Sequence, residues 1–130
     1  MKINRNPTAI HPPLAAYSHQ IELGGKQRWL VMSGQIGLEK DGTLPADLTE
    51  QFKLALANID HNLRAADMGI VDLVKLTIYL AADMDPEKRR ELLSSWLNGH
   101  RPTMTLLYVA ALASPDIKVE IEALASAESD

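Results

Sequence analysis

Cysteine is absent from the 130 residues of the chain. Its absence excludes disulfide bonds, thiolate zinc sites and cysteine nucleophiles, and it fits the reducing cytoplasm, where we expect the protein. Long apolar runs are absent as well, since none approaches the roughly 20 residues that span a bilayer. Residues 1–7 also lack the apolar stretch of a signal peptide. We therefore expect no membrane partner and no signal peptide.

A long run of charges of one sign is also missing, and the net charge is -4. Nonspecific nucleic-acid binding depends on lysine and arginine side chains that neutralise phosphates. We therefore expect no nucleic-acid partner. What is present is an ordinary globular composition, 46% hydrophobic and 23% charged. The length corresponds to a single domain over residues 1–130.

The first part of the chain predicts an irregular arm and a β-hairpin. Residues 1–13 are polar and interrupted by prolines. Residues 17–23 and 28–33 are typical of two strands on either side of the Gly24-Gly25 turn. The two strands of the hairpin should pair with each other.

Two helices are predicted further along. Asp47 begins the first as a capping residue, and Gly69 is suited to end it. Its apolar residues recur at helical spacing and should face the core. The second begins at Asp85-Pro86 and ends near Gly99.

Three more strands are predicted, at 72–80, 104–109 and 118–125, from alternating apolar and polar residues. The order of elements is then β-β-α-β-α-β-β, which suggests a mixed sheet with both helices on one face. Apolar residues including Leu73 and Leu124 should lie on the other face. A surplus of exposed apolar surface indicates a homo-oligomer.

Four segments, taken in order, resemble motifs of the RidA/YjgF family and cover nearly the whole chain. Each motif is short, but their shared order identifies the chain as a member. The segments are Ala16-Tyr17-Ser18-His19-Gln20, Val31-Met32-Ser33-Gly34-Gln35-Ile36, residues 58–77 and residues 118–125.

This resemblance implies a chorismate-mutase-like α+β fold, with a six-stranded mixed sheet and two helices on one face. It also implies a homotrimer with small-molecule clefts between subunits. The activity best known for the family is hydrolysis of reactive imines and enamines to keto acids and ammonia. No cofactor or metal is implied, and the histidines show none of the usual metal-ligand spacings.

One departure from the family concerns the residue that holds a substrate carboxylate. Deaminating members have Pro-Ala-Arg where this chain has Pro102-Thr103-Met104. A guanidinium binds a carboxylate through two charge-assisted hydrogen bonds, whereas methionine offers no donor. Losing them should weaken carboxylate binding by roughly one to two powers of ten. Leu106 replaces a family cysteine, so the ligand should be less anionic or more apolar than a short imino acid.

The remaining site residues come from the same resemblance. Glu120 matches a glutamate that positions or activates water, and Tyr17 matches a pocket tyrosine. Ser33 and Gly34 match the strand end where the backbone approaches the ligand. Arg90 lies near a position at the cleft rim, where it could supply a replacement cation.

Each of these residues also has a purely structural interpretation. Glu120 and Arg90 could be solvated side chains, Tyr17 could pack its ring, Gly34 could relieve crowding, and Met104 could fill the core. Three functions stay open: a ligand-binding protein with altered or lost imine hydrolysis, an active deaminase for small imino acids, and a non-enzymatic regulatory or chaperone-like trimer. The acidic charge balance argues against ribonuclease activity.

Overall fold

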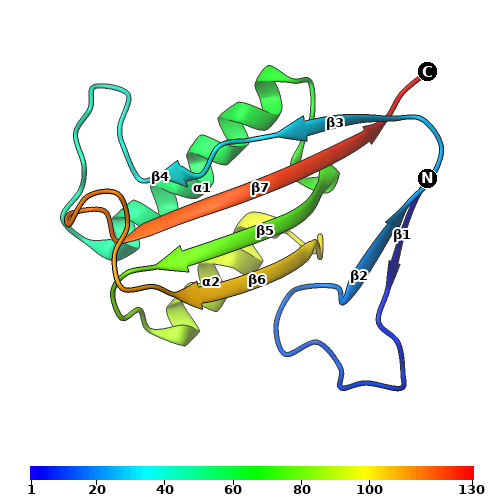
Figure 1. Ribbon diagram of the computed structural model, residues 1–130, viewed down its shortest axis with the longest axis horizontal. Coiled ribbons are helices and arrows are strands. Elements are labelled where there is room, and N and C mark those ends of the chain that lie inside the picture. Colours follow the sequence, from blue (N-terminus) through cyan, green and yellow to red (C-terminus); the bar gives the residue numbers. More distant parts are fainter.

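The computed structural model describes residues 1–130, and its main feature is a five-stranded mixed sheet backed by two helices (Figure 1). The strand order is β3-β7-β5-β6, and β4 also pairs with β7. β5 and β6 are parallel, and the other pairings are antiparallel. The strands are β3 (Gln27–Val31), β4 (Gln35–Ile36), β5 (Leu73–Leu80), β6 (Thr103–Tyr108) and β7 (Val119–Glu128).

Both helices begin as the sequence predicts. The Asp47 side chain accepts a hydrogen bond from the Glu50 amide and caps α1 (Leu48–Ala65). Asp85 likewise accepts from the Glu87 amide and caps α2 (Pro86–Leu97). The predicted end of α1 at Gly69 was wrong. The helix ends at Ala65, and Gly69 instead precedes the short 3-10 helix η1 (Ile70–Asp72).

The core lies between the two helices and one face of the sheet. The predicted apolar stripe of α1 is buried, and alternate residues of β5 and β7 meet it. The core-facing side chains of these three elements include Leu48, Phe52, Leu56, Ile59, Leu63, Leu76, Ile78, Leu80, Val119, Ile121, Ala123 and Ala125.

Leu73 does not lie on the open face of the sheet, so that expectation was wrong. A shift in the β5–β7 register between Leu73 and Lys75 inserts one extra residue. Because strand side chains alternate between faces, this bulge turns Leu73 into the core, where it is fully buried. Leu124 does lie on the open face, between the core-facing Ala123 and Ala125.

The predicted hairpin does not form. β2 (Gln20–Leu23) pairs instead with β1 (Lys2–Arg5), in a separate two-stranded sheet. We expected the arm over residues 1–13 to be irregular, but it contains strand β1. The main sheet has five strands, so the expected count of six was also wrong. The sequence showed that residues 20–23 were extended, but not which strand they would pair with.

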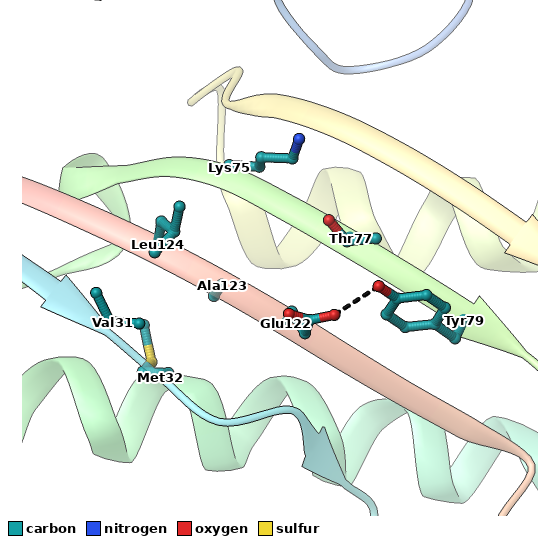
Figure 2. A pocket seen from close by; sticks show the side chains of 8 residues that line it. All are labelled: Val31, Met32, Lys75, Thr77, Tyr79, Glu122, Ala123 and Leu124. Atoms are coloured by element: carbon teal, nitrogen blue, oxygen red, sulfur yellow. Dashed lines mark hydrogen bonds between the residues drawn. The ribbon is translucent and has the colours of Figure 1, made fainter. Parts of the chain in front are cut away.

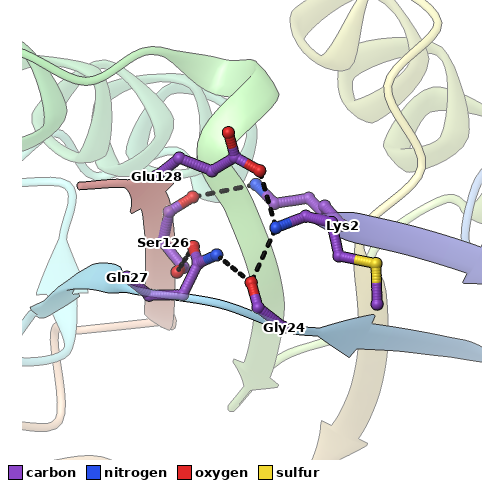
Figure 3. A network of polar contacts seen from close by, with 6 residues as sticks. Lys2, Gly24, Gln27, Ser126 and Glu128 are labelled. Carbon is purple, nitrogen blue, oxygen red and sulfur yellow. Dashed lines mark hydrogen bonds and ion pairs between the residues drawn. The ribbon is translucent and has the colours of Figure 1, made fainter. Parts of the chain in front are cut away.

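A polar network joins the small sheet to the main one (Figure 3). Lys2 Nζ donates to the Ser126 carbonyl oxygen at 2.9 Å. Ser126 Oγ donates to Gln27 Oε1 at 2.7 Å, and Gln27 Nε2 donates to the Gly24 carbonyl oxygen at 2.8 Å. Burial lowers the pKa of Lys2, and the charge of nearby Asp72 opposes that shift. The network attaches the start of β1 and the end of β2 to β3 and β7. No helix of the structure has both the length and the apolar character needed to cross a membrane.

Candidate functional site

A hollow of about 170 Å³ lies where α2, β6 and the loop between β1 and β2 meet. A second hollow of about 100 Å³ shares four of its residues, which are Ala15, Arg90, Leu93 and Met104. The two form one site, called here the β6 hollow. Its lining residues are Leu14, Ala15, Ala16, Tyr17, Arg89, Arg90, Leu93, Ser94, Met104 and Leu106.

Strand alternation places two predicted residues in this hollow. Met104 pairs with Leu76 and Leu106 with Ile78, both core-facing residues of β5. Met104 and Leu106 therefore point to the helix side of the sheet, toward α2. On α2, Leu93 follows Arg89 and Arg90 by four and three residues. At this spacing the three side chains share one face of the helix.

The loop that carries Tyr17 is held in place by its neighbour Ser18, which is 3% exposed. Ser18 Oγ donates to the Arg101 carbonyl oxygen at 2.6 Å. Its amide donates to the Pro102 carbonyl oxygen at 3.1 Å. These bonds attach the loop to the residues just before β6. The Tyr17 hydroxyl accepts from the Leu14 amide at 3.1 Å, which leaves its own O–H free to donate.

The charges around the β6 hollow are all positive. Arg89 Nη1 donates to the Tyr108 hydroxyl at 3.4 Å. The exposed side chain of Arg90 takes part in no hydrogen bond or salt bridge within the chain. No carboxylate lines the hollow. Two guanidinium groups thus stand beside the methionine that replaces the expected arginine.

Glu120 and Gly34 form a second locus elsewhere on the sheet. Glu120 pairs with Ile36 of β4 and with Tyr79 of β5, on the face away from the helices. A Cβ on Gly34 would lie 2.7 Å from Glu120 Cδ, so the carboxylate side chain occupies the space that glycine leaves. The neighbouring Ser33 is exposed, and its carbonyl oxygen accepts from Gln35 Nε2 at 2.9 Å.

The structure therefore brings together some of the predicted residues and separates others. Tyr17, Arg90, Met104 and Leu106 line one hollow. Ser33, Gly34 and Glu120 lie on the other face and at the other side of β5. Within one chain the two loci do not share a cavity.

Sequence reasoning did not place Leu93, Ala15 or Arg89 in the site. Arg89 and Leu93 share a helix face with Arg90, a spacing visible in the sequence. Ala15 carries no such signal, because only the loop geometry brings it to the hollow.

A wider cavity of about 320 Å³ opens on the face of the sheet opposite the helices (Figure 2). Figure 2 shows Tyr79 and Glu122 pointing toward each other, and Tyr79 Oη donates to Glu122 Oε1 at 2.5 Å. This hydrogen bond, above all, raises the pKa of Tyr79. Lys75 and Thr77 line the same cavity. No group of three or more His, Cys, Asp or Glu side chains is arranged to hold a metal ion.

Comparisons with known proteins agree with this architecture. Residues 8–127 match the family described as Endoribonuclease L-PSP. The chain is 33% identical over 121 residues to the 2-iminobutanoate/2-iminopropanoate deaminase of Mus musculus, which covers 92% of this chain and 84% of the relative. It is 31% identical over 123 residues to the Escherichia coli (strain K12) protein of the same name, and this match covers 92% of this chain and 90% of the relative.

Solved structures show the same relationship. YyfB from Yersinia pestis, of the conserved Rid protein family, superimposes with a TM-score of 0.82 at 29% identity, over 95% of this chain and 97% of that one. TdcF from E. coli with bound serine superimposes with a TM-score of 0.67 at 31% identity, over 95% and 96%. Sequence and fold both place this chain in the RidA/YjgF family.

Proposed function

We propose that the protein hydrolyses small imines at a site assembled between subunits of a homotrimer. The observation that carries this proposal is the separation of the two loci. Met104, Tyr17 and Arg90 line a hollow that contains no carboxylate, while Glu120 lies on the other face of the same sheet. A second copy that brings its Glu120 against the β6 hollow would complete the site.

The open face of the sheet supports association of copies. Trp29 is 56% exposed, Val31 75% and Leu107 44%. Strand register puts all three on the same face as Leu124. Val31 and Leu124 are direct cross-strand neighbours, and exposed apolar side chains gathered in this way typically mark an interface. The trimeric state itself follows from the family resemblance.

Glu120 is the group we assign to water activation. Its carboxylate takes a proton from water as the water oxygen bonds to the imine carbon, and it passes that proton to the imine nitrogen. The resulting carbinolamine then loses ammonia: its hydroxyl proton passes to nitrogen, the C–N bond breaks, and the hydroxyl oxygen becomes the carbonyl oxygen of a keto acid. One imine and one water thus yield one carbonyl compound and one ammonia, with no oxidant or cofactor.

Met104 is the residue that sets this chain apart. The mouse and E. coli relatives are named as deaminases of 2-iminobutanoate and 2-iminopropanoate. We propose that Met104 and Leu106 alter the substrate preference of this chain relative to such enzymes. Because neither side chain can bind a carboxylate, a ligand-binding protein without hydrolytic activity is the second candidate. The family is also described as an endoribonuclease, but the net charge of -4 disfavours RNA binding.

Ammonia release provides the test. A dehydratase acting on threonine generates the imine, and ammonia formation is timed with and without the protein. We expect the wild type to accelerate release and E120Q to abolish the acceleration. E122Q is the matched control, because it removes the same charge from the same strand at a carboxylate that does not contact Gly34. Equal activity in E120Q and wild type would refute the role given to Glu120.

Light scattering tests the assembly separately. A trimer has three times the chain mass of 14.3 kDa. A monomer at working concentration would contradict a site shared between subunits. Saturable ligand binding without any acceleration of hydrolysis would favour the second candidate.

A further inference from the structure

Building on the proposed function, we infer that the β6 hollow selects imino acids with large apolar side chains and binds their carboxylate through Arg90 of α2. The carboxylate-binding group would then come from a helix, whereas the family pattern places it on the strand that now carries Met104. The hollow combines positive charge and apolar surface in one cavity. A ligand that complements both must carry an anionic group and a hydrocarbon group.

The anionic end is the first part of the inference. Arg90 lines both parts of the hollow and has no acidic partner in the chain. Its guanidinium is permanently charged and can bind a carboxylate with two parallel hydrogen bonds. Tyr17 lines the same hollow, and its O–H is free to donate. Arg89, whose guanidinium contacts the Tyr108 hydroxyl, adds a second positive charge.

The apolar end is the second part. Leu93, Met104 and Leu106 come from two elements and converge on the hollow. Its volume of about 170 Å³ is several times the share of one water molecule, roughly 30 Å³. A branched aliphatic side chain can therefore displace several waters from apolar surface, whereas the methyl group of an alanine-derived imine cannot. Methionine is also adaptable in shape, which suits a pocket for side chains of varied form.

Imino acids produced from leucine, methionine and alanine by an amino-acid oxidase, with catalase present, test this selectivity. Semicarbazide traps imine that has not been hydrolysed, so suppression of the semicarbazone measures the enzyme. A methylene group in an apolar pocket changes specificity by about tenfold or more, so kcat/KM for the leucine-derived imine should exceed that for the alanine-derived imine at least about tenfold. Equal values, or a preference for alanine, would overturn the inference.

Variants test recognition of the carboxylate and recognition of the apolar side chain separately. R90Q should lower kcat/KM for both imines about tenfold, because a charge-assisted contact is lost. R90K should retain part of the activity. K88Q is the matched control, since Lys88 carries the same charge on the same helix and does not line the hollow. L106S should instead reduce the preference for leucine over alanine. If K88Q lowers kcat/KM as much as R90Q does, the positive charge of Arg90 acts only by general electrostatic attraction. That result would overturn the proposed carboxylate contact of Arg90.

Binding of the stable keto acid of leucine keeps this test independent of catalysis. Calorimetry should show that wild type binds the keto acid more tightly than the uncharged ketone of the same carbon skeleton, and that R90Q loses this difference. If no imine is hydrolysed but this binding pattern holds, the proposed function fails and the inference about the hollow stands. If imines are hydrolysed and R90Q binds and reacts like wild type, the inference fails and the proposed function stands.

Discussion

The carboxylate of Glu120 occupies the space that a side chain at Gly34 would fill. A Cβ at position 34 would lie 2.7 Å from Cδ and 2.8 Å from Oε2 of Glu120. The absence of a side chain at Gly34 therefore leaves room for the Glu120 carboxylate at this position. The contact joins the predicted strand-end motif to the predicted catalytic residue.

The substitution G34A should displace the Glu120 side chain while preserving the fold, because the atoms it meets belong to a flexible side chain. A displacement of about 1 Å can cost roughly a hundredfold in rate, so we expect a loss of that order in imine hydrolysis. Thermal unfolding should change little. G69A is the control, since a Cβ on Gly69 meets nothing within 4 Å. Full activity in G34A would show that the position of the Glu120 carboxylate is unimportant.

Restoring an arginine on β6 tests the effect of Met104. The M104R variant would place a guanidinium deep in the hollow and remove apolar surface. We expect the preference to move toward short imino acids, with kcat/KM for the alanine-derived imine rising about tenfold. The semicarbazone assay measures the change, and M104L serves as a volume-matched control. An unchanged preference in M104R would mean that this position does not contact the ligand.

Gln51 is a stability determinant that the sequence did not reveal. Gln51 lies on α1, and its side chain is fully buried. Its Nε2 donates to the carbonyl oxygens of Pro45 at 2.7 Å and Asp116 at 2.9 Å, and its Oε1 accepts from the Lys118 amide at 2.9 Å. Q51L would leave these three groups without partners, so urea denaturation should show a loss of about 3 kcal/mol.

A matched substitution on the same helix provides the comparison for Q51L. Asn62 is exposed on α1, and its side chain bonds only to the Asn58 carbonyl oxygen. N62L should change the free energy of unfolding by less than about 0.5 kcal/mol. Equal effects of the two variants would contradict the account of Gln51.

Tyr79 gives a prediction about pH. Its hydrogen bond to Glu122 favours the protonated phenol and raises the pKa of Tyr79 in the folded protein above the unfolded value near 10.0. The folded state then holds the proton more tightly, so this contribution to stability is complete below the unfolded pKa and is lost as the pH rises through the folded one. Ultraviolet titration should show one of the three tyrosines ionising later than the others.

The E122Q variant tests the cause of that late ionisation. Removing the carboxylate should move the late tyrosine back toward the other two. If all three tyrosines of the wild type ionise together, or if E122Q leaves the late one in place, the hydrogen bond is not the source of the shift.

Local signals in the sequence predicted the elements well. Asp47 and Asp85 cap the two helices because capping depends on a few neighbouring residues. The alternation in β5 and β7 identified the core face because it reflects a period of two. The sequence was less informative about which strands pair with each other. β2 pairs with β1 rather than β3, a choice that depends on contacts distant along the chain.

In the candidate site, too, the individual residues were predictable from the sequence, but their arrangement in space was not. Family motifs pointed to Tyr17, Glu120 and Met104 individually. Their separation onto two faces of the sheet follows from strand register, which no single motif contains. The approach of Arg90 to Met104 likewise depends on how α2 packs beside β6.

Complementation between two inactive variants is the most direct test of a site shared between copies. A15W should fill the β6 hollow, and E120Q should remove the catalytic carboxylate, so each alone should be inactive. When equal amounts of the two are unfolded together and refolded at random, roughly a quarter of all sites in the resulting trimers should combine an intact hollow with an intact Glu120 from the neighbouring subunit. Recovery of about that fraction of wild-type activity is the predicted result, and mixed trimers with no recovered activity would contradict the account.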